Sequence, residues 1–337
     1  MSLAIVYKSA VPNARVSYHS GLGICSMHVV KVLQAHKIKS ELWGVQNGED
    51  LWAVLAQRPD ITHVVLQAPF FDTQFLRKLL VRFQSVMFTT VCHSNVGFLA
   101  IDSFSTKVLK ENLAVENNYH NFLASGNSVK YCNAVKHTFR KPCLYLPNLY
   151  PLDNLISKPV YDGGEALRVG VFGAIRVMKN LYSGVWAGMQ LGTFLNKDVV
   201  VSINVGREES GQGVYSALKE LVKGVPHVTL NEVTWQDHAA FRNTVAHQHI
   251  CINPSFTESH SLTTCDSIAE GVPVVVSPAM DWMPKKFQAN PDDIAEIAGK
   301  ALSLLRDRKA TKQAYAALNS FNSSGVYHWE RFLELGA

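Results

Sequence analysis

The sequence predicts an α/β protein built from two doubly wound parallel sheets. Three observations predict it. Short, continuously apolar segments alternate with segments of helical period, this rhythm is interrupted once at residues 147–167, and 337 residues exceed the usual size of one domain. Apolar runs of this kind are typical of parallel strands that helices cover on both faces. We therefore expect two Rossmann-like domains that bind a ligand at the carboxyl ends of their strands, in the cleft between them.

The expected elements follow in chain order. In the first half, the strand-like runs are 3–7, 41–45, 62–66, 86–91 and 143–146, with helical segments at 24–36 and 75–83. Three prolines and the pair Gly163-Gly164 make 147–167 the predicted linker. In the second half, the strand-like runs are 167–172, 199–203, 228–230, 250–252 and 272–276. The predicted domains are residues 1–155 and 156–322.

The composition is that of a globular protein. The chain is 47% apolar and 18% charged, which excludes disorder, and no run approaches the ~18 apolar residues of a membrane span. The N-terminus lacks the pattern of a signal peptide and reads as a first strand. The six cysteines are widely scattered, which predicts reduced thiols rather than a zinc site or a disulfide framework. We expect a cytoplasmic protein.

The charge is unevenly distributed. Residues 1–155 hold 15 Lys and Arg against 9 Asp and Glu, a net charge of +6, whereas the remainder is close to neutral. This asymmetry predicts an anionic partner for the first half, such as nucleic acid or a membrane surface, or else an unevenly charged but merely solvated surface.

Two short motifs in the first half are candidates. Gly21-Leu22-Gly23 precedes a helix and would be a dinucleotide fingerprint in a dehydrogenase, but Ser26 replaces the third glycine and the motif lies far from the first strand. It is either a loop that lets a ligand approach a helix N-terminus or a plain turn. His93 directly follows the strand 86–91, so it is either functional or a hydrogen-bonded structural residue.

The segment 250–277 is the most informative. An apolar strand leads into a Ser/Thr-rich loop with Glu258, a helix begins near Ser261, and a glycine turn leads into another strand. The unpaired N–H groups at such a helix start suit a diphosphate, and the carboxylate can accept hydrogen bonds from sugar hydroxyls. The alternative is a capping motif, with Ser259 or Ser261 as the N-cap and the acids complementing the helix dipole.

This segment resembles the signature of retaining GT-B glycosyltransferases of family 4, the group 1 glycosyltransferases. Pro254-Ser255, Glu258 and the run from Ala269 to Val275 match in order and spacing, although Asp266 stands where the family has a second Glu. Further resemblances are Gly21-Leu-Gly23, Val91-Cys-His93, Leu146-Pro-Asn148, Gly170–Asn180 and Val326–Glu330. The resemblance implies a GT-B architecture, with an N-terminal acceptor-binding domain, a C-terminal nucleotide-sugar-binding domain and a helix at 323–337 that packs back on the first.

The resemblance also implies residue roles. Glu258 would hold the sugar hydroxyls, His93 would hydrogen-bond the donor sugar, and Lys179 would neutralise the diphosphate of the leaving group. Arg176 would substitute for the family arginine, whose place Ala174 takes. The implied donor-binding residues are Gly173, Arg176, Ser259, His260, Ser261, Leu262, Thr263 and Asp266, and the implied acceptor-side loop is Gly21, Leu22 and Gly23.

Such enzymes retain the anomeric configuration without an obvious protein nucleophile, by front-face attack, and need neither metal nor cofactor. Accordingly, Asp292-Asp293 after Pro291 reads as a helix start rather than a metal site. The implied donor is a nucleotide-diphosphate sugar, most simply a UDP-sugar, and the acceptor is a hydroxyl.

The acceptor would meet the basic first half, through the basic amphipathic segment 75–83 or through Lys130, Lys136, His137, Arg140 and Lys141. A hydroxylated base in DNA and a membrane glycolipid are both admissible. A sugar-nucleotide epimerase or hydrolase, and a non-catalytic GT-B binding protein, remain alternatives.

Overall fold

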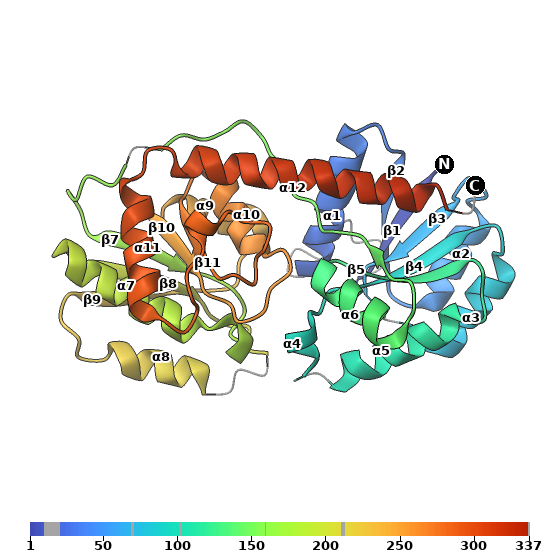
Figure 1. The fold of residues 1–337 in the computed structure, drawn as a ribbon, viewed down its shortest axis with the longest axis horizontal. Coiled ribbons are helices and arrows are strands. Elements are labelled where there is room, and N and C mark those ends of the chain that lie inside the picture. Colours follow the sequence, from blue (N-terminus) through green and yellow to red (C-terminus); the bar gives the residue numbers. More distant parts are fainter. Residues whose placement is uncertain (10–20, 69–70, 101–102, 159, 210–212, 336–337) are drawn as a thin grey trace. The chain divides into compact units, whose positions relative to one another are not determined.

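A computed structural model describes residues 1–9, 21–68, 71–100, 103–158, 160–209 and 213–335 of the chain. The chain divides into two compact units (Figure 1). Unit 1 comprises Met1–Pro151 and Phe321–Ala337, and unit 2 comprises Leu152–Ser320. Each unit contains one parallel sheet with flanking helices, which confirms the predicted fold class.

Unit 1 is built on a six-stranded parallel sheet with the order β2-β1-β3-β4-β5-β6. Its strands are β1 (Leu3–Lys8), β2 (Ser40–Val45), β3 (His63–Leu66), β4 (Met87–Cys92), β5 (Phe122–Gly126) and β6 (Leu144–Tyr145). Its helices are α1 (Gly21–Ala35), α2 (Gly48–Ala56), α3 (Thr73–Arg82), α4 (Val96–Leu99), α5 (Ser103–Glu116) and α6 (Val129–Phe139).

The two faces of this sheet are covered by different helices, because successive side chains of a strand point to opposite faces. Leu3 and Ile5 pack with α1 and with the end of the C-terminal helix. Ala4 and Val6 pack with α2 and α3 on the other face. Apolar residues are therefore needed at residues 3–7 of β1, and this explains why its sequence shows a continuous apolar run before Lys8.

The C-terminal helix α12 (Ala310–Leu333) begins in unit 2 and ends in unit 1. Trp329 is fully buried among core residues of unit 1, and its indole Nε1 donates to the Pro147 carbonyl over 3.0 Å. The Asn322 amide makes two hydrogen bonds with the backbone of Tyr150, at 2.7 and 3.1 Å. The last helical turns are thus an integral part of unit 1.

Unit 2 is built on a five-stranded parallel sheet with the order β11-β10-β7-β8-β9. Its strands are β7 (Leu167–Val171), β8 (Val199–Asn204), β9 (Val228–Val233), β10 (Ile250–Asn253) and β11 (Val274–Val276). Its helices are α7 (Leu181–Leu195), α8 (Val214–Val222), α9 (His238–Ala246), α10 (Leu262–Ala269), α11 (Ile294–Arg306) and the start of α12, with short 3₁₀ helices η1 (Val177–Lys179) and η2 (Lys285–Phe287).

Glycines of helix α7 face the strands of unit 2 and leave no room for a side chain there. A Cβ at Gly184 would lie 2.7 Å from Val171 Cγ1, and one at Gly188 would lie 3.3 Å from Val169 and Val201. Larger residues at these positions would push α7 outward. The close approach fixes the loop between β7 and α7, which includes η1.

The structure tests two features that the sequence predicts. Leu76, Leu79 and Leu80 of α3 are buried in the core of unit 1, so the amphipathic stripe of this helix faces the protein. Asp293 is the N-cap of α11, as predicted, and its carboxylate accepts from the Glu296 N–H over 2.9 Å.

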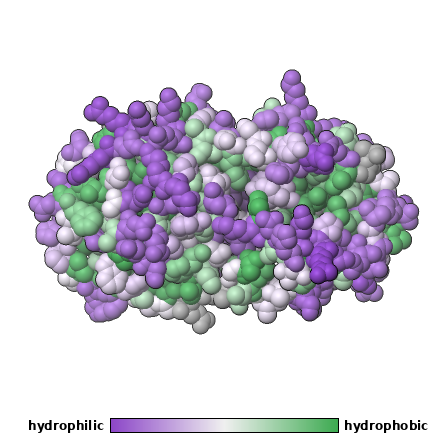
Figure 2. All heavy atoms as spheres, viewed as in Figure 1, coloured by the Kyte–Doolittle hydropathy of each residue, from purple (hydrophilic) through white to green (hydrophobic). Residues whose placement is uncertain are grey.

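On the face shown in Figure 2, hydrophilic and hydrophobic residues are interspersed. No described helix is both long and apolar enough to cross a bilayer.

Candidate functional site

The candidate site lies where the direction of winding reverses in the sheet of unit 2. Strand β7 pairs with β8 on one side and with β10 on the other. The loops that leave the carboxyl ends of β7 and β10 therefore diverge to opposite faces, and the crevice at such a switch point is where open α/β sheets bind ligands. Lys179 lies in η1 after β7, and Glu258 lies in the loop after β10.

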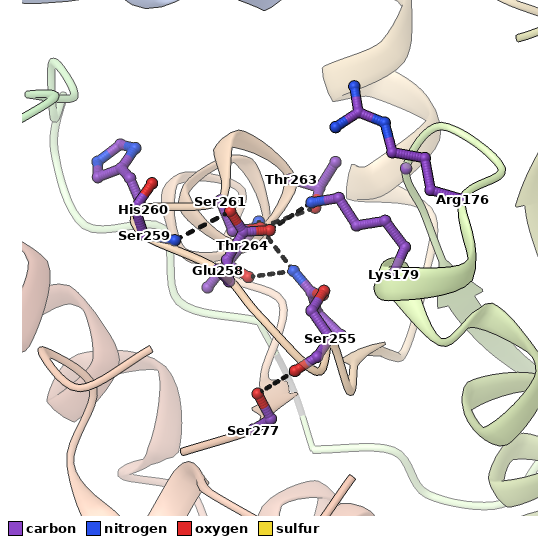
Figure 3. Close-up of polar contacts among 12 residues, drawn as sticks. Arg176, Lys179, Ser255, Glu258, Ser259, His260, Ser261, Thr263, Thr264 and Ser277 are labelled. Carbon is purple, nitrogen blue, oxygen red and sulfur yellow. Dashed lines mark hydrogen bonds and ion pairs between the residues drawn. The ribbon is translucent and has the colours of Figure 1, made fainter. Parts of the chain in front are cut away.

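Lys179 and Glu258 form an ion pair between these two loops. Their side chains point toward one another (Figure 3), and the Lys179 ammonium donates to Glu258 Oε2. Both side chains are largely buried, with 19% and 13% of their area exposed. Burial is the largest single effect and would raise the pKa of Glu258, but the charge and hydrogen bond of Lys179 and the Ser259 N–H together outweigh it, so the pKa lies below its ordinary value. The carboxylate is ionised at neutral pH and is an acceptor only.

Asn180 ties the two loops together. It adopts the left-handed conformation with φ 53°, which Asn tolerates better than most residues. Its side-chain amide donates to the Pro254 carbonyl over 3.1 Å and to the Pro291 carbonyl over 2.7 Å. The Phe256 N–H also donates to the Met178 carbonyl over 3.0 Å. These bonds fix the distance between the two loops that contain Lys179 and Glu258.

Helix α10 begins beside Glu258 and presents its N-terminus there. Ser261 is the N-cap, one of the two residues named for it in the capping-motif alternative, and its hydroxyl accepts from the Thr264 N–H over 3.4 Å. Its φ of 58° is a strained value for a residue other than glycine. The Asn253 amide at the end of β10 donates to the hydroxyls of Ser261 and Thr264, at 2.5 and 3.0 Å, and so holds the cap in place. The first N–H groups of α10 and their partial positive charge remain available for an anion.

Ser259, His260, Leu262 and Thr263 are brought together with Glu258, as expected. The Ser259 N–H donates to Glu258 Oε1 over 3.2 Å, which orients the carboxylate. His260 is buried, and its ring lies 3.5 Å from Cys265 Sγ and 6.2 Å from the Trp282 ring centroid. Its imidazole therefore supports the loop from inside rather than offering itself to a ligand.

We expect unit 2 to lose stability as the pH falls, because of His260. Burial lowers the pKa of its imidazole to about 4, whereas an unfolded histidine titrates near 6.5. The unfolded chain therefore takes up this proton first, so stability that is complete above pH 6.5 is lost progressively as the pH falls toward 4. The measurement is the free energy of unfolding between pH 7.5 and 4, a pH range that brackets these two pKa values. The His260→Phe variant should show a shallower slope, and an unchanged slope would contradict the assignment.

Asp266 does not point toward the expected ligand. Its side chain is fully buried on the face of α10 that packs on α9, and its Oδ1 accepts from His238 Nε2 over 2.8 Å. A fully buried carboxylate cannot reach a ribose in this conformation, so the expected ribose contact is corrected to an internal contact between two helices. Asp266 stands where family 4 has a glutamate, but its shorter side chain faces α9 and does not enter the candidate site.

Arg176 is also engaged elsewhere. Its guanidinium pairs with Glu209, a residue that pairs with Arg207 as well, and the Arg207 guanidinium lies 5.0 Å from the Trp235 ring centroid. Arg176 thus belongs to a charged cluster with residues that follow β8. It can bind a diphosphate only if its ion pair with Glu209 breaks. Gly173 has φ 144°, which side chains rarely adopt, and its N–H donates to the Asn204 amide oxygen over 3.1 Å. It keeps the chain after β7 compact beside Lys179.

His93 lies in unit 1, directly after β4, as predicted. Its Nε2 donates to Gln67 Oε1 over 2.9 Å, and its Nδ1 accepts from the Asn127 amide over 3.1 Å. Gln67 and Asn127 directly follow β3 and β5, which flank β4 in the sheet. The three side chains therefore meet at the carboxyl ends of these strands. Both nitrogens of the His93 ring already have partners within unit 1.

Gly21, Leu22 and Gly23 form the first turn of α1 rather than a loop before it. The Ser26 hydroxyl donates to the Leu22 carbonyl over 2.7 Å, a bond typical of a helix interior. Residues 10–20, which precede this turn, lie outside the described residues. The predicted glycine loop is thus corrected to a helix start, and the helix begins three residues earlier than the apolar pattern indicated.

Sequence reasoning missed several residues that shape these sites. Gln67 and Asn127 each stand at the first position after a strand, a signal that could have found them. Asn180 follows Lys179 directly, but its bonds to two distant carbonyls have no local sequence signature. His238 and Glu209 pair with predicted residues across the fold, and no pattern in the sequence indicates these pairs.

Comparison with known proteins adds the fold family. No family model and no curated protein sequence matches this chain. Among solved structures, it is similar to sucrose-phosphate synthase from Thermosynechococcus elongatus, with a TM-score of 0.69, 13% identity and 98% of both chains covered. It is similar to Anabaena HepE in complex with UDP-glucose, with a TM-score of 0.63, 14% identity and 98% of both chains covered.

A third similar structure is S. aureus TarM in complex with UDP, with a TM-score of 0.59 and 13% identity. The match covers 81% of this chain and 55% of the TarM chain. These neighbours are GT-B glycosyltransferases. This chain therefore has the GT-B fold, as the resemblance to family 4 implied, with one parallel α/β unit at each end of its sequence.

Proposed function

We propose that the chain is a retaining glycosyltransferase that moves a sugar from a UDP-sugar to a hydroxyl acceptor. The observation that carries the proposal is the Lys179–Glu258 pair, which lies at the switch point of unit 2 beside the N-terminus of α10. A cation and helix N–H groups suit a diphosphate, and an ionised carboxylate suits sugar hydroxyls. The UDP-glucose complex of HepE and the UDP complex of TarM support this choice of donor.

In the proposed reaction, the donor binds between Lys179 and Glu258, and their contacts with the donor replace the ion pair that they form with each other. Lys179 and the first N–H groups of α10 take the diphosphate, and Glu258 accepts hydrogen bonds from the sugar. The bond between the anomeric carbon and the diphosphate oxygen breaks, and the acceptor oxygen attacks from the same face. Its proton passes to the departing diphosphate. Lys179 stabilises the negative charge that builds on the leaving group, so that no metal ion is required.

The roles of Arg176 and His93 in this proposal each require an exchange of partners. Arg176 would leave Glu209 to meet the diphosphate. His93 would give up one of its two amide partners to bond a sugar hydroxyl, while the other amide keeps the ring oriented. Gln67 and Asn127 are therefore positioning residues in this proposal.

For the acceptor we propose an anionic molecule that meets the basic face of α6. Lys130, Lys136 and His137 of this helix and Arg140 at its end are exposed. A DNA strand that carries a hydroxylated base and a membrane glycolipid both offer such a charge.

We expect Lys130→Glu with Lys136→Glu to raise the KM for an anionic acceptor by about threefold or more and to leave the KM for the donor unchanged. The reason is that reversed charges repel the acceptor on approach, and the effect should shrink as salt is added. The matched control is Lys219→Glu with Lys223→Glu, which makes the same change of charge on exposed residues in α8 and at its C-cap in unit 2. Equal changes in both KM values, or equal effects of the two double variants, would contradict this acceptor surface.

The test of the proposed function is a time course of UDP-sugar consumption with and without acceptor. A panel of hydroxylated DNA and glycolipid vesicles serves as the acceptor, and each reaction is repeated with EDTA. A transferase consumes donor only with acceptor, forms an α-linked product from an α-linked donor, and is indifferent to EDTA. Consumption without acceptor would favour the epimerase or hydrolase, and binding without consumption would favour a non-catalytic protein.

A further inference from the structure

A cavity lies at the end of the unit 2 sheet opposite to Lys179 and Glu258. It has a volume of about 240 Å³, and it opens where β7, β10 and β11 begin. Its walls come from the chain before β7, from the residues between α9 and β10, and from the turn between α11 and α12. Lys179 and Glu258 follow the carboxyl ends of these strands, so the cavity is separated from them by the length of a strand, about 15 Å.

Cationic side chains outnumber acidic ones in this cavity. Lys158, Arg168 and Arg308 line it, together with Glu165 and Asp307. Both acids are already neutralised. Glu165 is held by Arg168 through two hydrogen bonds, at 2.7 and 3.0 Å, and Asp307 pairs with Lys286 at 2.6 Å. The pKa values of both carboxyls are accordingly lowered by these cations.

Among the residues that the structure describes, the remaining two cations form no close ion pair with a carboxylate; Glu270 acts on Lys158 only at longer range, and Glu270 itself is paired with Arg242. Lys158 is half-buried and donates to the Ala246 carbonyl at the end of α9. Burial lowers the pKa of this ammonium, which shows that its surroundings disfavour the charge. Arg308 is exposed at the rim and takes part in no ion pair within the described ranges. Burial outweighs the attraction of Glu270 at Lys158, so a bound anion at closer range would offset the cost of this half-buried charge.

The start of α12 adds a hydrogen-bond donor to the same wall. Ala310 and Thr311 line the cavity, and they form the first turn of a helix of 24 residues. The Ala310 N–H already donates to the Asp307 carbonyl over 3.0 Å, so the N–H that this turn offers to the cavity is that of Thr311, and the helix dipole places partial positive charge there. An ammonium, a guanidinium and a helix N-terminus around one cavity match a group that has several acceptor oxygens and a negative charge.

We propose that this cavity binds the phosphate group of a small phosphorylated molecule, at a site separate from the proposed donor site. A phosphate has three acceptor oxygens for the three kinds of donor, whereas a carboxylate has two. The volume lies below the 300–1,000 Å³ that is typical of pockets for larger ligands, so the occupant is a compact molecule such as a sugar monophosphate rather than a dinucleotide. The inference does not depend on the proposed glycosyl transfer.

The experiment is a calorimetric titration of the full chain with inorganic phosphate and with glucose 6-phosphate. It is carried out in the Lys179→Met background, which removes the cation of the proposed donor site. Citrate is titrated as the carboxylate comparison. We expect both phosphates to bind more tightly than citrate, and we expect Lys158→Met with Arg308→Ser to weaken phosphate binding by about tenfold or more. The matched control is Lys309→Ser, which removes a neighbouring cation that does not line the cavity.

Two further readouts protect the test against misfolding. Each variant is melted without phosphate, and Arg308→Ser alone, at an exposed position, should keep the melting temperature and still weaken binding severalfold. Phosphate that binds equally well to the double variant and to the Lys309→Ser control would overturn the proposal. Absence of binding to the Lys179→Met parent would overturn it as well, because every phosphate effect would then belong to the Lys179 site.

Discussion

Glu258→Gln lowers the turnover of sugar transfer by at least about tenfold and leaves the fold intact, according to the proposed mechanism. The substitution keeps the size of the side chain but removes the negative charge that holds Lys179 and accepts from the sugar. An interaction with the reacting sugar that strengthens in the transition state is lost from kcat as well as from kcat/KM. Lys179→Ala should have an effect of at least similar size, because the leaving diphosphate then lacks its cation.

The control for this prediction is Glu220→Gln, which makes the same change at an exposed position of α8. Melting curves of the variants show whether unit 2 keeps its stability. Since Lys179 and Glu258 are in direct contact, the double variant should cost less than the two single losses combined. Near-normal turnover of either single variant, with a verified donor and acceptor, would refute the site assignment.

Trp329→Ala lowers the free energy of unfolding of unit 1 by about 3–5 kcal/mol, the usual cost of deleting a large buried aromatic side chain. Trp329 has no exposed area, and it packs against Leu3 and Ile5 of the central strand β1. The hydrogen bond from its indole to Pro147 is lost too. Hydrogen exchange of the β1 amides measures the effect in unit 1 alone, because a two-unit chain need not unfold in one step.

The matched control for Trp329 is Trp186→Ala on α7, where 46% of the side chain is exposed. We expect it to cost clearly less than Trp329→Ala, since close to half of the Trp186 surface stays in contact with water. A third variant, Trp329→Phe, keeps an aromatic ring and loses the indole N–H, so its effect should be intermediate. Equal costs at positions 329 and 186 would show that the end of α12 is not part of the core of unit 1.

The strands with continuous apolar runs were predictable, because parallel strands covered on both faces need apolar residues at every position. Residues 3–7 of β1 illustrate this rule, and β7, β8 and β10 were recognisable because their one or two polar residues leave most of each run apolar. Strand β5 (Phe122–Gly126) was not foreseen, since Ser125 and Gly126 interrupt its apolar run. Ser125 is nevertheless buried, and its hydroxyl accepts from Thr89 over 2.7 Å and donates to the Thr90 carbonyl over 3.0 Å. Buried polar residues that satisfy each other across strands are invisible to a hydropathy pattern.

The candidate site divides in the same way. The positions of Glu258 after a strand and of Ser261 at a helix start were predictable, because strand ends and helix starts have local signatures, whereas Lys179 came only from the resemblance to family 4. The direction in which Asp266 points was not, since it depends on which face of α10 packs on α9 and on His238 at the start of that helix. The partner of Arg176 was equally hidden, because Glu209 reaches it from the loop after a different strand. Sequence spacing indicates which residues lie near a site, but tertiary packing decides which of them face it.

The most direct test of the central claim is a thermal unfolding series with UDP, GDP, ADP and NAD, with and without EDTA, on the native chain and on Lys179→Met. A ligand that binds only the folded state stabilises it by about 2.7 kcal/mol at a hundredfold excess over its Kd, which a melting curve resolves. We predict stabilisation by UDP that EDTA does not change and that Lys179→Met largely abolishes. Stabilisation by NAD alone, or an equal response of the two proteins to UDP, would contradict the assignment of a nucleotide-sugar site at the Lys179–Glu258 pair.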